Sequence, residues 1–332
     1  MKILYFYISS YSFGGGHLKR AENYQYNFYK YRAKFKKINL VDENNHTILK
    51  FNEISAKIKK FDTIFFDVSN KRFFGNKINK KLLKKIFSSF SNKIIIIDGL
   101  NDETITSKFK YRYKCVIIPY IFNRNKLDKI DGVKYLLGIR YFLTAKFKRN
   151  YEQNFNLINK KILFTSGSSD LENSTLKFLK LIRPIYNKYI KLYILIGPYF
   201  SKQYVKQIID YSINNNLNFK FTNFKGDIYK NVLNKSLVIT SSGLTKYDLF
   251  VANIPLVVFC ENNSQQKLNL EFKKKFQGYC FNNLIYNKKN IIKLNDIINK
   301  NNYIKKYLSI TNRIKANDFQ SIYNLTKNEN EN

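Results

Sequence analysis

The sequence predicts an α/β protein built from two Rossmann-like domains, whose parallel sheets face each other across a cleft. Short apolar runs alternate with longer amphipathic, lysine-flanked segments, a pattern typical of βαβ units. The chain has 332 residues, more than one compact core usually holds, so two domains are expected. Hydrophobic residues make up 44% of it and aromatic residues 17%, which is enough to build globular cores.

Residues 1–150 are expected to form the first domain, in which apolar runs such as "DTIFF" and "IIII" are the strands. The predicted strands cover 2–8, 62–66, 94–97, 115–118 and 133–137, and the predicted helices cover 18–33 and 77–90. The polar stretch "KFKRNYEQNFNLINK" at 146–160 has no clean period, and we place the domain junction there.

Residues 151–325 are expected to form the second domain, with the same alternation of strand and helix. The predicted strands cover 161–165, 191–196, 218–221, 236–240 and 255–259. The predicted helices cover 172–189, 201–215, 226–234, 244–252 and 264–276. A last amphipathic stretch spans about 304–324, and residues 326–332 are expected to be a frayed tail.

The formal net charge of +36 comes from lysines that recur around every apolar segment and do not collect into one basic arm. This distribution predicts a solvated surface, not a nucleic-acid groove, although anionic substrates would be attracted. The three cysteines show neither disulfide nor metal-ligand spacing, and no apolar run approaches the roughly 20 residues that cross a bilayer. We therefore expect a cytoplasmic protein without a metal, a cofactor or an integral membrane segment.

The stretch "YSFGGGHLKR" at 11–20 places glycines and a histidine between a predicted strand and a predicted helix. Gly14, Gly15 and Gly16 let the backbone approach a ligand closely, and the amides of the next helical turn suit a phosphate or an oxyanion. The imidazole of His17 can exchange a proton near neutrality. The alternative is a tight turn with His17 as a capping residue. His46, in a polar segment, is assigned no chemistry.

Three polar loops follow successive predicted strands of the second half. "LFTSGSSDLEN" at 163–173 and "LVITSSGLTKYDLF" at 237–250 each join a strand to a helix through a Ser/Gly turn, which suits an anion. "CENNSQQ" at 260–266 brings carboxamides that can bind polar ligand edges. Each loop alone is more often an ordinary turn or helix cap, but three at successive strand ends of one domain favour a binding site.

These motifs resemble those of the UDP-sugar hydrolases of pseudaminic-acid biosynthesis, a branch related to the MurG-type glycosyltransferases of the GT-B fold. "GGGHLKR" is similar to the family's GxGHxxR, and "LLGIRYFL" at 136–143 to its LLGPxYALL. "ILFTSGSSDLENSTLKFL" and "VITSSGLTKYDLFVANIPLVVF" resemble the second-domain motifs, and "ENNSQQ" resembles the Asn/Gln segment after them. The resemblance covers about residues 1–285.

The resemblance implies a metal-independent, inverting displacement of UDP from UDP-2,4-diacetamido-2,4,6-trideoxy-β-L-altropyranose or a relative. His17 would activate the water, and Asp248 stands where the family has a Glu that holds the ribose. Asn263 or Gln265 would touch the sugar or the diphosphate, and main-chain amides would hold the diphosphate. The implied substrate-binding residues are Gly14, Gly15, Gly16, Arg20, Asp67, Tyr141, Gly167, Ser168, Ser241, Ser242, Gly243, Leu244, Asp248, Asn263 and Gln265.

The sequence departs from the family pattern on the sugar side. Phe6 and Ile8 replace an Arg and an Asp of the first strand, Ser168 replaces a glycine, and Ser69 replaces a Tyr. Two alternatives to the hydrolase therefore stay open. One is a glycosyltransferase on the same scaffold, for which peripheral membrane contact would be expected with a lipid-linked acceptor. The other is a nucleotide-sugar-binding module that has lost catalysis.

Overall fold

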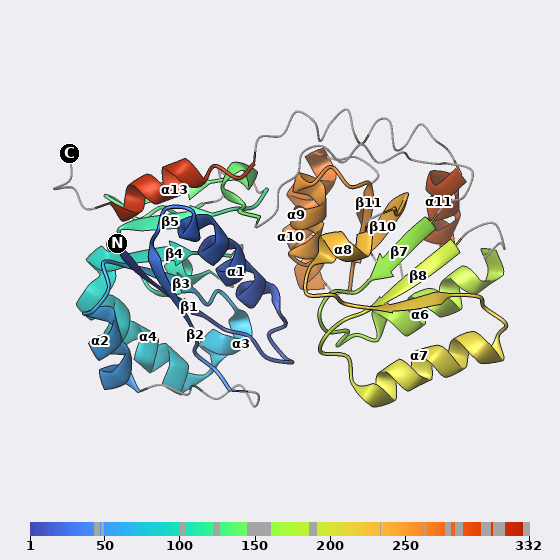
Figure 1. The fold of residues 1–332 in the computed structure, drawn as a ribbon, viewed down its shortest axis with the longest axis horizontal. Helices are drawn as coiled ribbons and strands as arrows, with labels where there is room; N and C mark the ends of the chain where they lie inside the picture. The colour runs from blue at the N-terminus through green and yellow to red at the C-terminus, as the bar shows by residue number, and fades with distance from the viewer. Residues whose placement is uncertain are drawn as a thin grey trace. The chain divides into compact units, whose positions relative to one another are not determined.

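The computed structural model describes residues 1–42, 47, 50–99, 104–121, 127–144, 161–185, 191–232, 234–261, 263–275, 280–282, 288–299, 307 and 316–327. The chain forms two compact units, drawn in Figure 1. Unit 1 comprises Met1–Lys146 together with Lys315–Asn332, and unit 2 comprises Phe147–Ile314. Each unit is an α/β structure around its own six-stranded sheet.

The sheet of unit 1 is wholly parallel and has the order β2-β1-β3-β4-β5-β6. Its strands β1, β3, β4 and β5 are apolar and almost completely buried, as expected when helices cover both faces of a parallel sheet. The strands are β1 (Lys2–Tyr7), β2 (Lys34–Asn39), β3 (Thr63–Asp67), β4 (Ile94–Ile97), β5 (Cys115–Ile118) and β6 (Lys134–Leu137).

The helices of unit 1 cover both faces of this sheet (Figure 1). They are α1 (Gly16–Tyr29), α2 (Phe51–Ile58), α3 (Lys71–Gly75), α4 (Lys77–Phe90), α5 (Ile105–Lys108) and α13 (Phe319–Thr326). Short 3-10 turns lie at Ser91–Lys93 and Ile139–Tyr141. The helices α1 and α13 share one core with the sheet, in which Tyr24 and Phe28 of α1 and Phe319 of α13 are buried.

The sheet of unit 2 is also wholly parallel, in the order β12-β11-β10-β7-β8-β9. Counted from β7, this is the strand order of the Rossmann fold. The strands are β7 (Lys161–Thr165), β8 (Lys191–Ile196), β9 (Lys220–Asn223), β10 (Leu237–Ser241), β11 (Leu256–Cys260) and β12 (Cys280–Asn282). Phe164 of β7 stacks between Phe178 and Phe259 in the core, with centroids 4.0 and 5.3 Å away.

The helices of unit 2 are α6 (Ser174–Ile182), α7 (Lys202–Asn214), α8 (Ile228–Val232), α9 (Thr245–Val251), α10 (Asn263–Lys275) and α11 (Lys288–Asn299). A 3-10 turn, Arg183–Ile185, follows α6. Helices α6, α7 and α11 contribute buried side chains to one core on one face of the sheet. No helix in the described ranges has the length and apolar character needed to span a bilayer.

The two-domain α/β architecture expected from the sequence is confirmed, and the predicted strands of both halves are present. The strand β2, with sequence "KFKKIN", was missed because edge strands are only partly buried and its apolar residues are few. The strand β12 and the helices α2, α3, α5 and α11 were also not anticipated. Most of the predicted stretch 304–324, the junction 146–160 and His46 lie outside the described residues.

The C-terminal end of the chain departs from the predicted division. Residues up to 325 were expected in the second domain, whereas Lys315–Asn332 belong to unit 1. Phe319, Ile322 and Leu325 are buried in the core that α1 helps to form. Helical periodicity reveals an apolar face but not the surface on which it packs, so the sequence placed this helix with its neighbours in the chain.

Candidate functional site

The candidate site of unit 1 lies where the strand order reverses. The strand β1 sits between β2 and β3, so the connections after β1 and β3 leave the sheet in different directions. In open α/β sheets, ligands bind beyond the carboxyl ends of the strands at such a point. The loop that follows β1 carries Gly14 and leads into α1, and β3 ends at Asp67.

Three side chains meet at this point because of local periodicity. His17 and Arg20 are three residues apart on α1 and therefore share the face that packs on the sheet. Asp67 is two residues beyond Phe65 on β3, so it points to the same side of the sheet as that core residue. All three residues were expected at the site from the sequence, and the structure brings them together.

The three side chains form a buried hydrogen-bonded network with two tyrosines. His17 Nδ1 lies 2.7 Å from Asp67 Oδ1, and Arg20 Nε donates to Asp67 Oδ2 at 2.7 Å. Arg20 Nη2 donates to Asp67 Oδ1 at 2.5 Å, and its Nη1 donates to the Tyr120 hydroxyl. The Tyr5 hydroxyl completes the set by donating to Asp67 Oδ2 at 2.9 Å. The carboxylate thus accepts four hydrogen bonds from three side chains.

The charges of this network keep Asp67 ionised. Burial alone would raise the pKa of the Asp67 carboxyl, but the Arg20 guanidinium and the contact with His17 outweigh it and hold the pKa well below its usual range. Burial and the adjacent Asp67 charge raise the pKa of Tyr5 well above its usual value. Burial also raises the pKa of Tyr120 to about 12, although Arg20 opposes the shift. Both tyrosines are therefore neutral at physiological pH.

An ionised Asp67 decides which nitrogen of His17 carries the proton. A carboxylate only accepts hydrogen bonds, so the short contact to Asp67 requires a proton on Nδ1. Arg20 Nη2 lies 2.9 Å from the same Nδ1, but a guanidinium nitrogen can only donate. The two nitrogens therefore do not bond to each other, and both donate to Asp67 Oδ1. Within the described part of the chain the contacts of the ring are made by Nδ1. In the neutral form of the ring, Nε2 is then the nitrogen that carries the lone pair and can accept a proton.

The glycine loop before His17 is a closed turn. Gly14 has a φ of +70°, which favours glycine, and its N–H donates to the Ser10 carbonyl at 2.8 Å. The Ser9 hydroxyl donates to the Gly14 carbonyl at 3.2 Å. Gly15 is the N-cap residue of α1, and no side chain caps this end of the helix. A helix of 14 residues without a side-chain cap leaves its first amides suited to an anion.

A second buried carboxylate shapes the same edge of the sheet. Asp98, just after β4, accepts hydrogen bonds from the Ser69 hydroxyl at 2.6 Å and from the Ile105 and Thr106 amides at 2.6 and 3.0 Å. Burial raises the pKa of Asp98 in spite of these donors. Ser69 therefore has a structural partner: through Asp98 it joins the loop after β3 to the start of α5.

Two predicted loops of unit 2 are brought together in the same way. The strands β7 and β10 are neighbours at the switch point of the second sheet. The Ser241 hydroxyl donates to the Ser166 carbonyl at 2.9 Å, which joins the two loops. Gly167 has a φ of +98°, and its N–H donates to Thr165 Oγ1 at 3.1 Å. Gly243 is exposed, with nothing within 4 Å of a Cβ built on it.

The glycine at 197 holds these loops in place and was not anticipated from the sequence. A Cβ built on Gly197 would lie 2.4 Å from the Gly167 carbonyl oxygen and 2.6 Å from that of Ser168. The Tyr199 amide donates to the Ser168 carbonyl at 2.9 Å. The turn after β8 therefore closes against the Gly167 loop, and only a glycine permits this approach.

The other predicted residues of unit 2 lie on α9 and α10. Leu244 is the N-cap residue of α9, and Asp248, in its first turn, is 5% exposed. Ser242 accepts a hydrogen bond from the buried Lys246 at 3.4 Å. Asn263 is the first residue of α10, and its side chain lies outside the described residues. Lys246 also donates to Asn269, and neither residue had been singled out.

The Gln265 carboxamide is hydrogen-bonded to the neighbouring Glu261. Its Nε2 donates to Glu261 Oε2 at 2.8 Å, and its Oε1 accepts from the Glu261 amide at 2.8 Å. Burial raises the pKa of Glu261 to about 7, although the bond from Gln265 opposes the shift. Glu261 lies just after β11 and had been assigned no role.

The structure does not bring every predicted residue to a site. Tyr141 is 3% exposed and belongs to the hydrophobic core of unit 1, although a substrate contact had been expected. Its burial favours packing, and the assignment stays a prediction. Tyr5 and Tyr120 were missed because a tyrosine inside an apolar strand, or directly after one, looks like any other core residue. Among the described residues, no group of three His, Cys, Asp or Glu side chains could hold a metal ion.

Comparisons with known proteins support the fold but leave the activity open. No family model matches the chain. Protein MJ1062 of Methanocaldococcus jannaschii, whose function is uncharacterised, is 28% identical over 257 residues, which is 72% of this chain. The match spans about half, 49%, of that relative.

Several solved structures share the fold over nearly the whole chain. MurG of Acinetobacter baumannii has a TM-score of 0.60 and 11% identity, with 98% of each chain covered. The rhamnosyltransferase SpnG, complexed with thymidine diphosphate, has a TM-score of 0.63 and 7% identity, covering 98% of this chain and all of its own. UDP-GlcNAc 2-epimerase of Neisseria meningitidis, bound to UDP-GlcNAc, has a TM-score of 0.58 and 14% identity, covering 99% and 100%. The chain thus has the GT-B fold.

Proposed function

We propose that the protein is a hydrolase that releases UDP from a UDP-activated amino or deoxy sugar by inverting attack of water at the anomeric carbon. The observation that carries this proposal is the His17–Asp67 pair at the switch point of the first sheet. A buried, ionised carboxylate that accepts from Nδ1 orients the ring and stabilises the imidazolium, as in other acid–base pairs. That arrangement prepares Nε2 to act as a general base.

In the proposed step, the oxygen of a water molecule forms a bond to the anomeric carbon. One proton of that water passes to His17 Nε2, and the bond between the anomeric carbon and the UDP oxygen breaks. The electron pair leaves on the diphosphate, and attack from the opposite face inverts the configuration. Asp67 gives up no proton; it holds Nδ1–H and balances the charge that His17 acquires. Help of this kind is typically worth about 10²–10⁴-fold in rate.

The nucleotide is assigned to unit 2 in this proposal. Its support is the pair of loops joined by Ser241 and Ser166 at the second switch point, where the exposed Gly243 leaves backbone amides accessible. Two proteins of similar fold are described as bound to thymidine diphosphate or to UDP-GlcNAc, which supports a nucleotide or nucleotide-sugar ligand but does not place it in either unit. Asp248 is proposed to bind the ribose, and Asn263 or Gln265 the sugar or diphosphate. Main-chain amides are proposed to take the place of a metal ion in neutralising the diphosphate.

A glycosyltransferase is the second candidate. SpnG, which is similar in fold, is named as a rhamnosyltransferase. The same base would then take a proton from an acceptor hydroxyl instead of water. The presence of Phe6 and Ile8 in place of charged residues does not weaken either candidate, because both side chains are fully buried and Phe6 stacks on Phe66 at 4.8 Å. They belong to the packing of the sheet.

The test is release of UDP from candidate UDP-sugars in water alone, followed by the same assay with acceptor sugars. The proposal expects UDP without an acceptor, with inverted product by NMR. His17→Ala should reduce turnover at least about hundredfold and leave the affinity for UDP, measured by calorimetry, unchanged. Asp67→Asn should also slow turnover, because the amide can hold Nδ1 in the wrong tautomer.

The matched control for Asp67 is Asp62→Asn, a nearby exposed residue whose carboxylate accepts only from the Lys2 amide among its described contacts. It should leave turnover unchanged. Release that requires an acceptor would replace the hydrolase with the transferase. Full UDP affinity without turnover, in wild type and in His17→Ala alike, would favour a binding module that has lost catalysis.

A further inference from the structure

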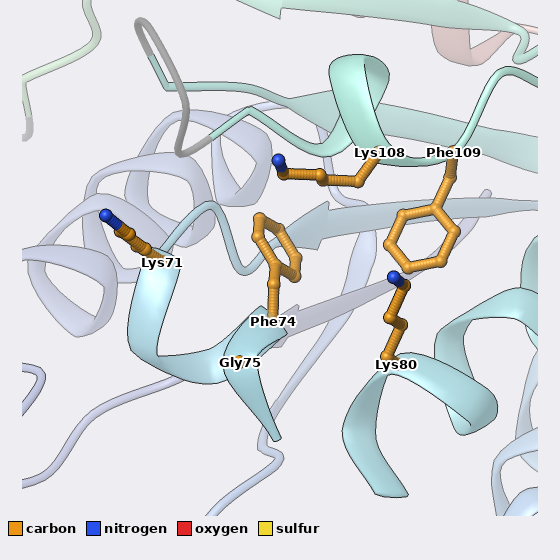
Figure 2. Close-up of a pocket in the computed structure, with 6 residues that line it drawn as sticks. All are labelled: Lys71, Phe74, Gly75, Lys80, Lys108 and Phe109. Atoms are coloured by element: carbon orange, nitrogen blue, oxygen red, sulfur yellow. The ribbon is translucent and has the colours of Figure 1, made fainter. Parts of the chain in front are cut away.

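Unit 1 contains a pocket that shares no residue with the His17–Asp67 network. It is lined by Lys71, Phe74 and Gly75 of α3, Lys80 of α4, Lys108 at the end of α5 and Phe109 after it (Figure 2). Its volume is about 380 Å³. Small-molecule sites have volumes of roughly 300–1,000 Å³, so this pocket can admit one small molecule. We call it the lysine pocket.

The inner wall of the lysine pocket is apolar and fixed. Phe74 and Phe109 are only 7% and 5% exposed, and their rings meet edge to face with centroids 6.1 Å apart. Phe109 is held from behind by Phe87, whose ring lies 5.5 Å away. The aromatic wall is therefore already ordered before a ligand arrives, and it offers a surface against which a flat apolar group can pack.

The rim of the pocket is cationic. Lys71, Lys80 and Lys108 are exposed, and none of the described residues that line the pocket is acidic. Among the described residues none of these lysines forms an ion pair, in contrast to Lys110, which pairs with Asp128 at 2.9 Å. Figure 2 shows Lys108 extending over Phe74 and Lys80 reaching toward the Phe109 ring, whereas the Lys71 ammonium lies at the outer edge and points away from both rings.

The segments that form the pocket contact the glycine loop before His17 and are linked to each other by hydrogen bonds. The α3 side chain Arg72 donates to the Ser12 carbonyl at 3.3 Å, and the Phe73 ring contacts Phe13 at 6.2 Å. Asp98, through its bonds to Ser69 and to the start of α5, connects the loop before α3 to the segment that carries Lys108. The pocket is therefore a built part of unit 1 and not a gap between loose surface loops.

We propose that the lysine pocket binds a second small molecule, a phosphate monoester whose apolar body packs on Phe74 and Phe109. A phosphate monoester carries nearly two negative charges and three strong acceptor oxygens, which suit the ammonium groups of Lys80 and Lys108, with Lys71 adding positive charge at the edge, better than a carboxylate does. A ligand of this class joins an anion to an apolar group, as the pocket joins a cationic rim to an aromatic wall. The inference does not depend on the proposed hydrolysis.

The test uses phenyl phosphate as the probe, with phenol and inorganic phosphate as its two halves. Calorimetric titration of the full chain should show phenyl phosphate binding at least about tenfold more tightly than either half, since neither half uses both the rim and the wall. The variant K71Q/K80Q/K108Q should lose at least about tenfold in affinity for phenyl phosphate. Because these lysines are exposed, the variant should keep the wild-type melting temperature.

The matched control is K202Q/K206Q/K220Q, which removes three exposed lysines from unit 2 and so lowers the net charge equally. It should bind phenyl phosphate as the wild type does. Equal losses in the two variants, or equal affinities for phenyl phosphate and inorganic phosphate, would show general attraction to a basic protein and overturn the proposal. UDP is assigned to unit 2, so both triple variants should bind UDP as the wild type does. Loss of phenyl phosphate binding with UDP binding kept therefore tests the lysine pocket alone, and loss of UDP binding tests the proposed function.

A membrane surface is the competing occupant. Sedimentation with vesicles of phosphatidylglycerol and with vesicles of phosphatidylcholine distinguishes it. Binding to the anionic vesicles that is lost in K71Q/K80Q/K108Q but kept in K202Q/K206Q/K220Q, without binding of phenyl phosphate, would overturn the proposal in favour of a lipid surface.

Discussion

At the scale of single residues, the buried ionisable groups of this protein differ in how they are compensated. Asp67 has a guanidinium, an imidazole and a tyrosine as partners, and its pKa lies well below the usual range. Glu261 is partly buried and accepts a hydrogen bond from the Gln265 carboxamide, but within the described chain no cation is in hydrogen-bond contact with it. Its pKa is raised to about 7. The same chemical group therefore serves as a fixed charge in unit 1 and as a titrating group in unit 2.

The raised pKa of Glu261 predicts a pH-dependent stability. The folded protein holds this proton up to about pH 7, whereas a glutamate in the unfolded chain loses it near pH 4.5. The stabilising contribution is thus complete below about pH 4.5 and is lost as the pH rises toward 7. Glu261→Gln, which retains the proton-bearing shape, should raise the free energy of unfolding by about 1–3 kcal/mol at pH 8 and change it little at pH 4.5.

Denaturant melts of the wild type and Glu261→Gln at the two pH values measure this difference. Glu53→Gln, at an exposed position on α2, is the matched control and should have no such pH-dependent effect. A gain in stability that is equal at pH 4.5 and pH 8 would mean that Glu261 does not titrate in this range.

At the scale of elements, the parallel strands position the sites through their carboxyl ends. The period of each element decides which side chains share a face. Phe65 and Asp67 are two residues apart on β3 and point to the same side of the sheet. His17 and Arg20 are three residues apart on α1 and share one helix face. In unit 2 the loops after β7 and β8 meet because Gly197, the first residue after β8, has no side chain. At Gly197 even a Cβ would clash with the backbone of the Gly167 loop, so packing fixes the loop geometry there.

Gly197→Ala is expected to destabilise unit 2 and to weaken UDP binding. The added Cβ would lie 2.4 Å from a backbone oxygen of Gly167, and backbone cannot move away as a flexible side chain can. Overpacking of this kind typically costs about 1–3 kcal/mol. Thermal melts measure the first effect and calorimetric titration of UDP measures the second.

Gly243→Ala is the control for stability in the same unit, because a Cβ there would meet nothing within 4 Å and its φ is not in the left-handed region. Its melting temperature should stay near that of the wild type. If Gly197→Ala melts like Gly243→Ala, the close approach of the two loops is not present in solution.

At the scale of the whole molecule, the chain completes its first unit with its last helix. The segment around α13 returns from unit 2 to the core of unit 1, where Phe319 meets Phe28 with centroids 4.7 Å apart. The Thr144 amide donates to Asn317 Oδ1 at 3.1 Å, which ties this returning segment to the end of the first stretch of unit 1. The stability of unit 1 therefore depends on residues almost 300 positions away from α1 in the sequence.

Phe319→Ala is expected to destabilise unit 1 by about 3–5 kcal/mol, because it empties a site among Phe28, Tyr31 and Tyr323. Hydrogen exchange followed by mass spectrometry should show faster exchange in α1 and little change in α7. Asn324→Ala, on the exposed face of α13, should have no such effect. Equal exchange rates in α1 for both variants would place α13 outside the cooperative core of unit 1.

The sequence by itself determined the two α/β domains, their alternating strands and helices, and the glycine loop with its histidine and Arg20. These features follow from local properties: hydrophobic period, the backbone freedom of glycine and three-residue spacing on a helix. The tertiary structure decided what local pattern cannot express. It paired Asp67 with Tyr5 and His17, set Gly197 against Gly167, and placed the last helix in the first unit. Such contacts join residues that are distant in sequence, and only the order of strands in each sheet brings them within bonding distance.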